Sequence, residues 1–182
     1  KGGMKIINLG IGSPDRYPPV EVLDGLGEAL YKPEAHKYQS YRSLPELREK
    51  ISVWYKRIYN VSLDSEKEVL PLLGSKEGIF YLSMAYLEKG DEVLVPNPGY
   101  PVYATAAKLC GARVVNYKLS KHNGWYPDIE ELSRLMNKRT KLIWINYVNM
   151  PTGVDFYYEK VKAILELARK RGVIVCNDNP YS

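Results

Sequence analysis

Cysteine and histidine are scarce in this sequence, with two residues of each type among 182. Cys110 and Cys176 both lie in apolar segments, and neither belongs to a Cys-x-x-Cys pair or a Cys/His cluster. Because structural zinc sites are built from such clusters, we expect no metal site and two reduced cysteines in the core. His36 and His122 lie in polar stretches, which is typical of surface histidines rather than catalytic ones.

Long apolar runs are absent as well. No segment approaches the roughly 20 residues that a membrane-spanning helix needs, and no signal-peptide pattern is visible. We therefore expect a cytoplasmic protein with no membrane partner. Repeats and low-complexity tracts are missing too, and apolar residues make up 45% of the chain. This composition predicts a globular domain with a sizeable core and excludes a disordered chain.

The excess of positive over negative charge is small. The chain has 26 Lys and Arg residues and 21 Asp and Glu residues, which gives a net charge of +5. A basic balance can indicate a nucleic-acid-binding protein. The basic side chains alternate with acidic ones, however, as at Glu46, Arg48, Glu49 and Lys50, which is typical of a solvated surface. We therefore expect no nucleic-acid partner, and the charge fits an anionic small molecule equally well.

From about residue 69, short β-rich runs alternate with helical patterns. Helices are predicted at 75–89 up to Gly90, after the capping box that begins at Asp128, and at 155–171 up to Gly172. Strands that alternate with helices pair in parallel through right-handed crossovers. The sequence therefore predicts an α/β fold of three layers, α/β/α, with a mostly parallel sheet. Its predicted strands are 68–73, 92–95, 113–118, 141–146 and 173–177.

The first part of the chain has a different pattern. Residues 1–40 are rich in Gly, Pro and Tyr, and only one short helix is predicted there, at 19–30. A second helix is predicted to begin at Ser43-Leu44-Pro45-Glu46, with these residues as its cap. We interpret residues 1–44 as an N-terminal arm with loops and residues 45–182 as part of one α/β domain.

Polar residues stand at four predicted strand exits. Ligands of open α/β sheets bind beyond the carboxyl ends of the strands. A carboxylate there can hold a protonated ring nitrogen, and a helix start with a hydroxyl and an amine can hold a phosphate. The combination suits a phosphorylated heteroaromatic cofactor. The four groups are Ser75 with Lys76, residues 97–100 with Tyr100, residues 149–153, and Asp178 with Tyr181.

Two nucleotide-binding motifs are excluded by single positions. A Walker A loop needs a glycine five residues before Gly74, where this chain has Val69. The pair Gly10 and Gly12 lacks the third glycine of a dinucleotide fingerprint, because position 15 is Asp15. A generic α/β nucleotide-binding module stays open as an alternative.

Each of the site candidates also has a structural interpretation when it is taken alone. Ser75 suits a helix N-cap, Tyr100 suits a core aromatic, and Asp178 suits a turn after a strand. The convergence of four strand exits on one edge of a sheet is what favours a binding site.

Together these segments resemble the fold-type I pyridoxal-phosphate-dependent aminotransferases of class I/II. The resemblance covers nearly the whole chain and rests on five motifs that occur in the same order. It implies that the α/β domain is part of the large, cofactor-binding domain of that family. The motifs are residues 8–15 (NLGIGSPD), 37–48 (KYQSYRSLPELR), 96–103 (PNPGYPVY), 151–153 (PTG) and 178–181 (DNPY).

The resemblance implies a role for each matching residue toward pyridoxal 5'-phosphate. Asp178 is expected to pair with the ring nitrogen, Tyr181 to donate to the ring hydroxyl oxygen, and Tyr100 to stack on the ring. Ser75 and Lys76 are expected to hold the phosphate. Two further matches lie in the arm: Tyr38, which would reach the phosphate of a partner subunit in a homodimer, and Gly12, which would lie near the substrate carboxylate.

Three positions depart from the family pattern. The asparagine that precedes Pro-Thr-Gly in the family is Met150 here, and a thioether cannot donate to the ring oxygen. Either Asn149 takes that place or Tyr181 acts alone. Ser43 stands where the family has a glycine, so the loop there can differ in shape. Asn179 replaces a common glutamate and is given no chemical role.

The Schiff-base lysine of the family is expected beyond Ser182, so no residue of this chain is assigned a catalytic role and the chain is expected to be an inactive fragment. The resemblance implies that the parent protein transfers an amino group from an α-amino acid to a 2-oxo acid. Segment 74–79 is similar to the diaminopimelate and aspartate branches of the family. Two alternatives stay open: another fold-type I lyase or decarboxylase, and an aminotransferase-like effector domain of a transcription regulator.

Overall fold

The computed structural model describes residues 7, 12 and 14–181, so most of the motif at 8–15 lies outside the described residues. The chain forms two compact units, Lys1–Pro71 and Leu72–Ser182. Within the described residues, none of the helices is both long enough and apolar enough to cross a membrane.

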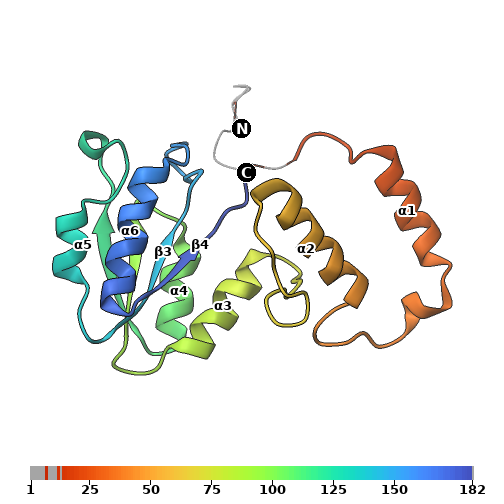
Figure 1. The fold of residues 1–182 in the computed structure, drawn as a ribbon, viewed down its shortest axis with the longest axis horizontal. Helices are drawn as coiled ribbons and strands as arrows, with labels where there is room; N and C mark the ends of the chain where they lie inside the picture. The colour runs from red at the N-terminus through yellow and green to blue at the C-terminus, as the bar shows by residue number, and fades with distance from the viewer. Residues whose placement is uncertain (1–6, 8–11, 13, 182) are drawn as a thin grey trace, which may run out of the picture. The chain divides into compact units, whose positions relative to one another are not determined.

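The second unit contains a sheet of four parallel strands in the order β2-β1-β3-β4 (Figure 1). A central position for β1 and β3 explains why both are almost entirely buried. This sheet confirms the predicted α/β fold. Its strands are β1 (Glu92–Asn97), β2 (Arg113–Lys118), β3 (Thr140–Ile145) and β4 (Ile174–Asn177).

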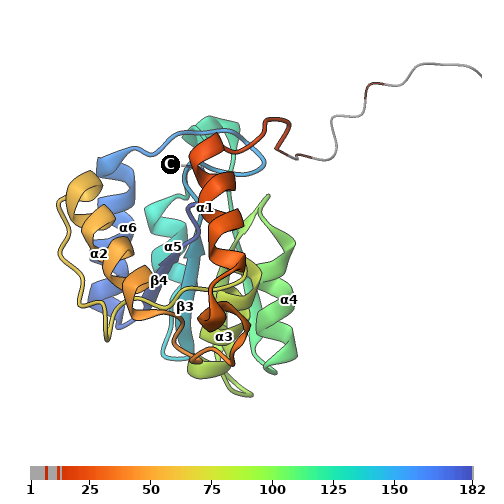
Figure 2. The same cartoon turned by 90° about the vertical axis from the view of Figure 1, so that its right-hand side faces the viewer.

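Helices cover both faces of the sheet, and each face has its own apolar cluster. On one face, α5 (Ile129–Leu135) and α6 (Tyr158–Arg171) pack Leu132 and Ile164 against Leu94 of β1. On the other face, α3 (Ser75–Tyr86) and α4 (Pro101–Leu109) pack on the opposite side chains of β1 and β3. Alternate strand residues point to opposite faces, so a strand such as β3, with buried side chains on both faces, needs helices on both sides of the sheet (Figure 2).

Four of the five predicted strands are present, and the prediction of a strand at 68–73 is wrong. No strand pairs with that segment among the described residues. Pro71 has no N–H to give to a sheet, and the side chain of Leu73 is fully exposed. The helix α4, in contrast, was not predicted from the pattern.

Helix ends also differ from the predicted ones. Gly74, at φ 144°, is the N-cap of α3, so Ser75 is its first residue and not its cap. The helix ends at Tyr86 rather than near Gly90, which lies in the turn before β1. The prediction for Asp128 is confirmed, because its Oδ1 accepts a hydrogen bond from the N–H of Glu131 at 2.9 Å.

The first unit holds α1 (Val20–Leu30), the short 3-10 helix η1 (Pro33–His36) and α2 (Pro45–Tyr59). The N-cap of α2 is Leu44, with no side-chain cap, and Ser43 lies before it at φ 65°. Ser43 is therefore not the cap that was expected, and its left-handed backbone explains why a glycine suits this position.

The side chain of Arg48 ties α2 to the loop that follows it. This guanidinium is 4% exposed, and it donates to the carbonyl oxygens of Arg42 and Ser43, both at 2.9 Å, and of Ser65 at 3.0 Å. It also pairs with Glu66 at 2.6 Å. These bonds join α2 to residues 65 and 66 within the first compact unit.

Candidate functional site

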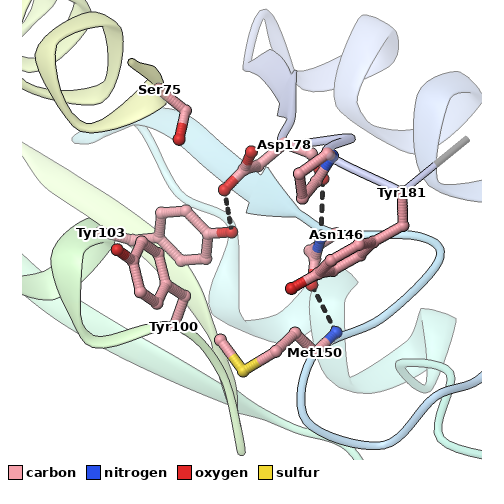
Figure 3. Close-up of a pocket in the computed structure, with 8 residues that line it drawn as sticks. Ser75, Tyr100, Tyr103, Asn146, Met150, Asp178 and Tyr181 are labelled. Carbon is pink, nitrogen blue, oxygen red and sulfur yellow. Dashed lines mark hydrogen bonds between the residues drawn. The ribbon is translucent and has the colours of Figure 1, made fainter. Parts of the chain in front are cut away.

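The strands β1, β3 and β4 end at the same edge of the sheet, and α3 begins beside it. A pocket of about 200 Å³ lies there (Figure 3). It therefore forms where strand exits were expected to converge. The residues that line it are Ser75, Tyr100, Tyr103, Asn146, Met150, Asp178, Pro180 and Tyr181.

Asp178 directly follows the edge strand β4, and both its main chain and its side chain are held. Its N–H donates to the carbonyl of Ile145 at 3.0 Å, and its carbonyl accepts from Nδ2 of Asn146 at 2.7 Å. The carboxylate Oδ2 accepts a hydrogen bond from the hydroxyl of Tyr103 at 2.8 Å. A half-buried carboxylate thus enters the pocket wall in a fixed position.

Two tyrosines from the start of α4 form an aromatic wall. Tyr103 is 1% exposed and stacks on Trp144 of β3, with ring centroids 5.0 Å apart and planes 5° from parallel. Tyr100 meets Tyr103 edge-on at 5.7 Å. Burial, and then the hydrogen bond to Asp178, raise the pKa of Tyr103 well above its usual value. Its hydroxyl therefore stays protonated and acts as a donor.

The opposite wall comes from the turn after β3, and its hydrogen bonds decide which residue faces the pocket. Asn149 is buried, with Nδ2 donating to the carbonyl of Asn146 at 3.0 Å and Oδ1 accepting from the hydroxyl of Thr152 at 2.6 Å. Its polar atoms are thus used inside the turn, and Met150 lines the pocket instead. The N–H of Met150 donates to Oδ1 of Asn146 at 2.6 Å.

The start of α3 forms a second hollow beside the pocket, and Ser75 and Tyr100 line both. Lys76 lines this second hollow and, like Ser75, is exposed. The first N–H groups of a helix have no partner within the helix, and the helix dipole favours an anion there. The positive φ of Gly74 turns the chain sharply into the helix. This hollow has the chemistry of a phosphate site.

Five of the eight predicted site residues line these two hollows: Ser75, Lys76, Tyr100, Asp178 and Tyr181. Asn149 is in the second unit but its side chain turns into its own loop. Tyr38 and Gly12 belong to the first unit, where Tyr38 is fully exposed and Gly12 has no atom within 4 Å of the Cβ position.

Two pocket residues with polar side chains were missed by sequence reasoning, Tyr103 and Asn146. Tyr103 comes three residues after Tyr100, a spacing that places both on one side of a helix start. Asn146 directly follows the apolar strand β3 and so stands at a strand exit. Both signals were present in the sequence, although neither distinguishes these residues from ordinary core or turn residues.

The same three-layer fold occurs in solved structures, aminotransferases among them. A substrate-bound structure of BacF from Bacillus subtilis is 35% identical with a TM-score of 0.90, over 95% of this chain and 44% of that chain. An aspartate aminotransferase of Thermus thermophilus, as a single mutant, is 30% identical with a TM-score of 0.90, over 95% of this chain and 45% of that chain. The fold therefore defines an α/β domain of the aminotransferase type.

The chain belongs to the family "Aminotransferase class I and II", whose model matches residues 4–182. Among its relatives is the LL-diaminopimelate aminotransferase of Dehalococcoides mccartyi (strain CBDB1), 40% identical over 180 residues. That of Moorella thermoacetica (strain ATCC 39073 / JCM 9320) is 41% identical over 180 residues. Each match covers 99% of this chain and 46% of the relative, so the chain spans about half the length of these relatives. Aminotransferases of this family use pyridoxal 5'-phosphate.

Proposed function

We propose that the protein to which this chain belongs is a pyridoxal-phosphate-dependent amino-acid aminotransferase, which moves the α-amino group of an amino acid to a 2-oxo acid. The observation that carries the proposal is the carboxylate of Asp178. It stands at a strand exit, where Tyr103 binds the carboxylate and Asn146 binds the main-chain carbonyl of the same residue, in a pocket that adjoins the start of α3.

The residues of the pocket fit the cofactor at each of its polar groups. Asp178 would hold a proton at the pyridine nitrogen, and the hydroxyl of Tyr181 would donate to the ring oxygen. Ser75 and Lys76, with the free N–H groups of α3, would hold the phosphate. Tyr100, which lines both hollows, would cover the ring between them. When bound, the cofactor supplies an electron sink for bond breaking at the substrate α-carbon.

The protein's own contribution is to hold charge in place. A carboxylate that faces the ring nitrogen keeps it protonated, because an opposite charge at close range favours the charged form. The rings of Tyr103 and Trp144 are buried, and Tyr103 binds the carboxylate of Asp178. On this buried side of the pocket, the charge of Asp178 acts more strongly than it would in water.

The side chain of Met150 has no hydrogen-bond donor. Tyr181 is therefore the residue that would donate to the ring oxygen. The side chain of Asn149, the alternative for this place, is turned into its own loop by its bonds to Asn146 and Thr152. We therefore favour the arrangement in which Tyr181 acts alone.

For the substrates, we propose an α-amino acid donor and a 2-oxo acid acceptor, with LL-diaminopimelate as the first donor to test. The support is the name shared by the relatives that are 37–41% identical over almost the whole chain. Aspartate and aromatic amino acids are the next donors, since aminotransferases for these share the fold at TM-scores of 0.90.

We also propose a homodimer with shared sites, in which Tyr38 reaches the phosphate of the partner subunit. A fully exposed tyrosine is an amphipathic side chain that suits a contact with a second chain. The test mixes full-length Tyr38→Phe with an excess of a variant that lacks the Schiff-base lysine. Cofactor affinity should recover at sites that receive Tyr38 from the lysine-less chain, whereas no recovery in confirmed heterodimers would contradict shared sites.

The proposed activity is tested with the full-length protein, pyridoxal phosphate, each amino-acid donor and a 2-oxo acid acceptor. We expect new amino acid and new 2-oxo acid in equal amounts. Release of carbon dioxide or of a β-substituent would instead indicate a decarboxylase or a lyase. Cofactor binding without turnover, together with binding to DNA, would indicate a regulator.

The same assay tests the role of Asp178. Asp178→Ala should lower kcat/KM by about 10²-fold or more, which corresponds to about 2.7 kcal/mol of transition-state stabilisation. Glu130→Ala removes a carboxylate that is exposed on α5 and should leave the rate unchanged. A rate for Asp178→Ala within about threefold of the wild type would rule out the assignment.

A further inference from the structure

Tyr103 lines the pocket and ends the motif at 96–103, where the resemblance implies no role for its side chain. Its ring is 1% exposed and lies flat against Trp144, at 5.0 Å and 5°. Its hydroxyl donates to Oδ2 of Asp178 at 2.8 Å, across 75 residues of sequence (Figure 3). A buried residue of α4 thus reaches the one carboxylate of the pocket.

The main chain of Asp178 does not need this hydroxyl to stay in place. Its N–H is bound to Ile145 at 3.0 Å, and its carbonyl is bound to Asn146 at 2.7 Å. What these bonds leave free is rotation of the side chain. The bond from Tyr103 removes that freedom, because it fixes one carboxylate oxygen on the side of α4.

The ring of Tyr103 is itself held so that its hydroxyl can point in one direction only. Trp144 covers one face, and Tyr100 meets it edge-on. A phenylalanine would make the same two ring contacts, so packing alone does not require a tyrosine here. Because burial and the neighbouring carboxylate raise the pKa of Tyr103, the hydroxyl remains a donor throughout the physiological pH range.

We propose that Tyr103 is a positioning residue, which orients the carboxylate of Asp178 toward the ring nitrogen of the cofactor and is itself oriented by Trp144. The inference rests on the proposed function, since it needs a ring nitrogen as the target of Asp178. It extends that function by assigning the hydroxyl of Tyr103 to the control of Asp178 and not to contact with the substrate.

The test measures dissociation constants of the full-length apoprotein for two ligands: pyridoxal phosphate and its 1-deaza analogue, in which a C–H group replaces the ring nitrogen. Tyr103→Phe removes only the hydroxyl. We expect it to weaken binding of pyridoxal phosphate by three- to tenfold and to leave binding of the analogue unchanged. In an Asp178→Ala background, the same substitution should have no further effect on either ligand.

Tyr117→Phe is the matched control. Tyr117 is equally buried, and its hydroxyl donates to the carbonyl of Trp144 at 2.7 Å. Its loss should lower the unfolding midpoint by a similar amount without changing the ratio of the two dissociation constants.

Two results would overturn the inference alone. The first is that Tyr103→Phe weakens the binding of both ligands equally, which would indicate a general structural role. The second is that it leaves the binding of both ligands unchanged. A different result would count against the proposed function: if Asp178→Ala itself leaves the affinity for pyridoxal phosphate unchanged, Asp178 does not hold the ring nitrogen and the role of Tyr103 falls with it.

Discussion

Asn146 directly follows β3, and its Nδ2 donates to the main-chain oxygen of Asp178, which directly follows β4, at 2.7 Å. It therefore joins two strand exits of the pocket. Its Oδ1 accepts from the N–H of Met150 at 2.6 Å. One buried amide therefore links the main chain of Asp178 to the main chain of Met150.

Asn146→Ala should lower the free energy of unfolding of the full-length protein by about 2–3 kcal/mol, because it leaves the N–H of Met150 and the carbonyl of Asp178, both partly buried, without partners. Urea unfolding measures this loss. Asn116→Ala, at an exposed position on β2, serves as the control and should change stability by less than about 0.5 kcal/mol. Equal effects of the two substitutions would show that the bridge is not needed for stability.

Met150→Asn should strengthen cofactor binding, because it places an amide donor on the wall that Tyr181 shares. One additional hydrogen bond is worth about 1 kcal/mol, or about fivefold in the dissociation constant of pyridoxal phosphate. Met150→Leu keeps the size of the side chain without the donor and should have no such effect. A similar gain for both variants would mean that shape, and not donation, limits binding at this wall.

Glu92 stands at the start of β1, 1% exposed, between two arginines and an asparagine. It accepts from Arg113 at 2.6 Å, from Arg139 at 2.8 Å and from Asn137 at 2.9 Å. Burial opposes its ionisation, but the bonds from Arg113 and Asn137 and the charges of the two arginines outweigh burial and lower the pKa of Glu92.

Glu92→Gln should therefore destabilise the protein in a pH-dependent way. At pH 7 we expect a loss of about 1.5–3 kcal/mol, the range for hydrogen bonds to charged groups. A lowered native pKa means that the stabilisation is complete above the ordinary value of 4.5 and is lost as the pH falls through the native pKa. Unfolding of both proteins at pH 7 and below pH 4 measures the difference. Glu130→Gln, at an exposed carboxylate, should show neither effect, and a loss for Glu92→Gln that is the same at all pH values would contradict the assignment.

Ser43→Gly should stabilise the first unit, because Ser43 has a φ of 65°. A left-handed conformation costs a residue with a Cβ about 1–2 kcal/mol, and part of that gain is offset by the greater freedom of glycine in the unfolded chain. We expect a net gain of about 0.5–1 kcal/mol in the free energy of unfolding. Ser62→Gly, at a serine outside the positive-φ positions, should instead lose stability by about 0.5 kcal/mol. A loss at both positions would argue against strain at Ser43.

Most of the fold could be predicted because the sheet leaves a strong pattern in the sequence. Segment 142–145 is apolar on both faces, and this pattern is typical of a strand that helices cover on both sides. Ligands bind beyond the carboxyl ends of parallel strands. This rule predicts that Ser75, Tyr100 and Asp178 lie in one site, although their distances are not known from the sequence. The wrong strand at 68–73 had β-forming residues, but propensity does not supply a partner strand, and Pro71 removes a donor.

The finer geometry of the pocket could not be read in the same way. Asn149 and Met150 are neighbours, and which of them faces the pocket depends on the bonds of Asn149 to Asn146 and Thr152 inside the turn. Tyr103 is one of 16 tyrosines in the chain. Its role depends on the rotation of α4 about its axis, which the spacing of apolar residues does not determine to within the width of one side chain.

The carboxylate of the pocket directly follows β4, and this has a consequence for local opening. When β4 separates from β3, with which it pairs, Asp178 leaves its place in the pocket. A ligand that binds Asp178 needs β4 closed, and by mass action it adds its binding energy to the energy of opening. The amide hydrogens of β4 should therefore exchange with solvent more slowly when the pocket is filled, so that this strand reports occupancy of the pocket.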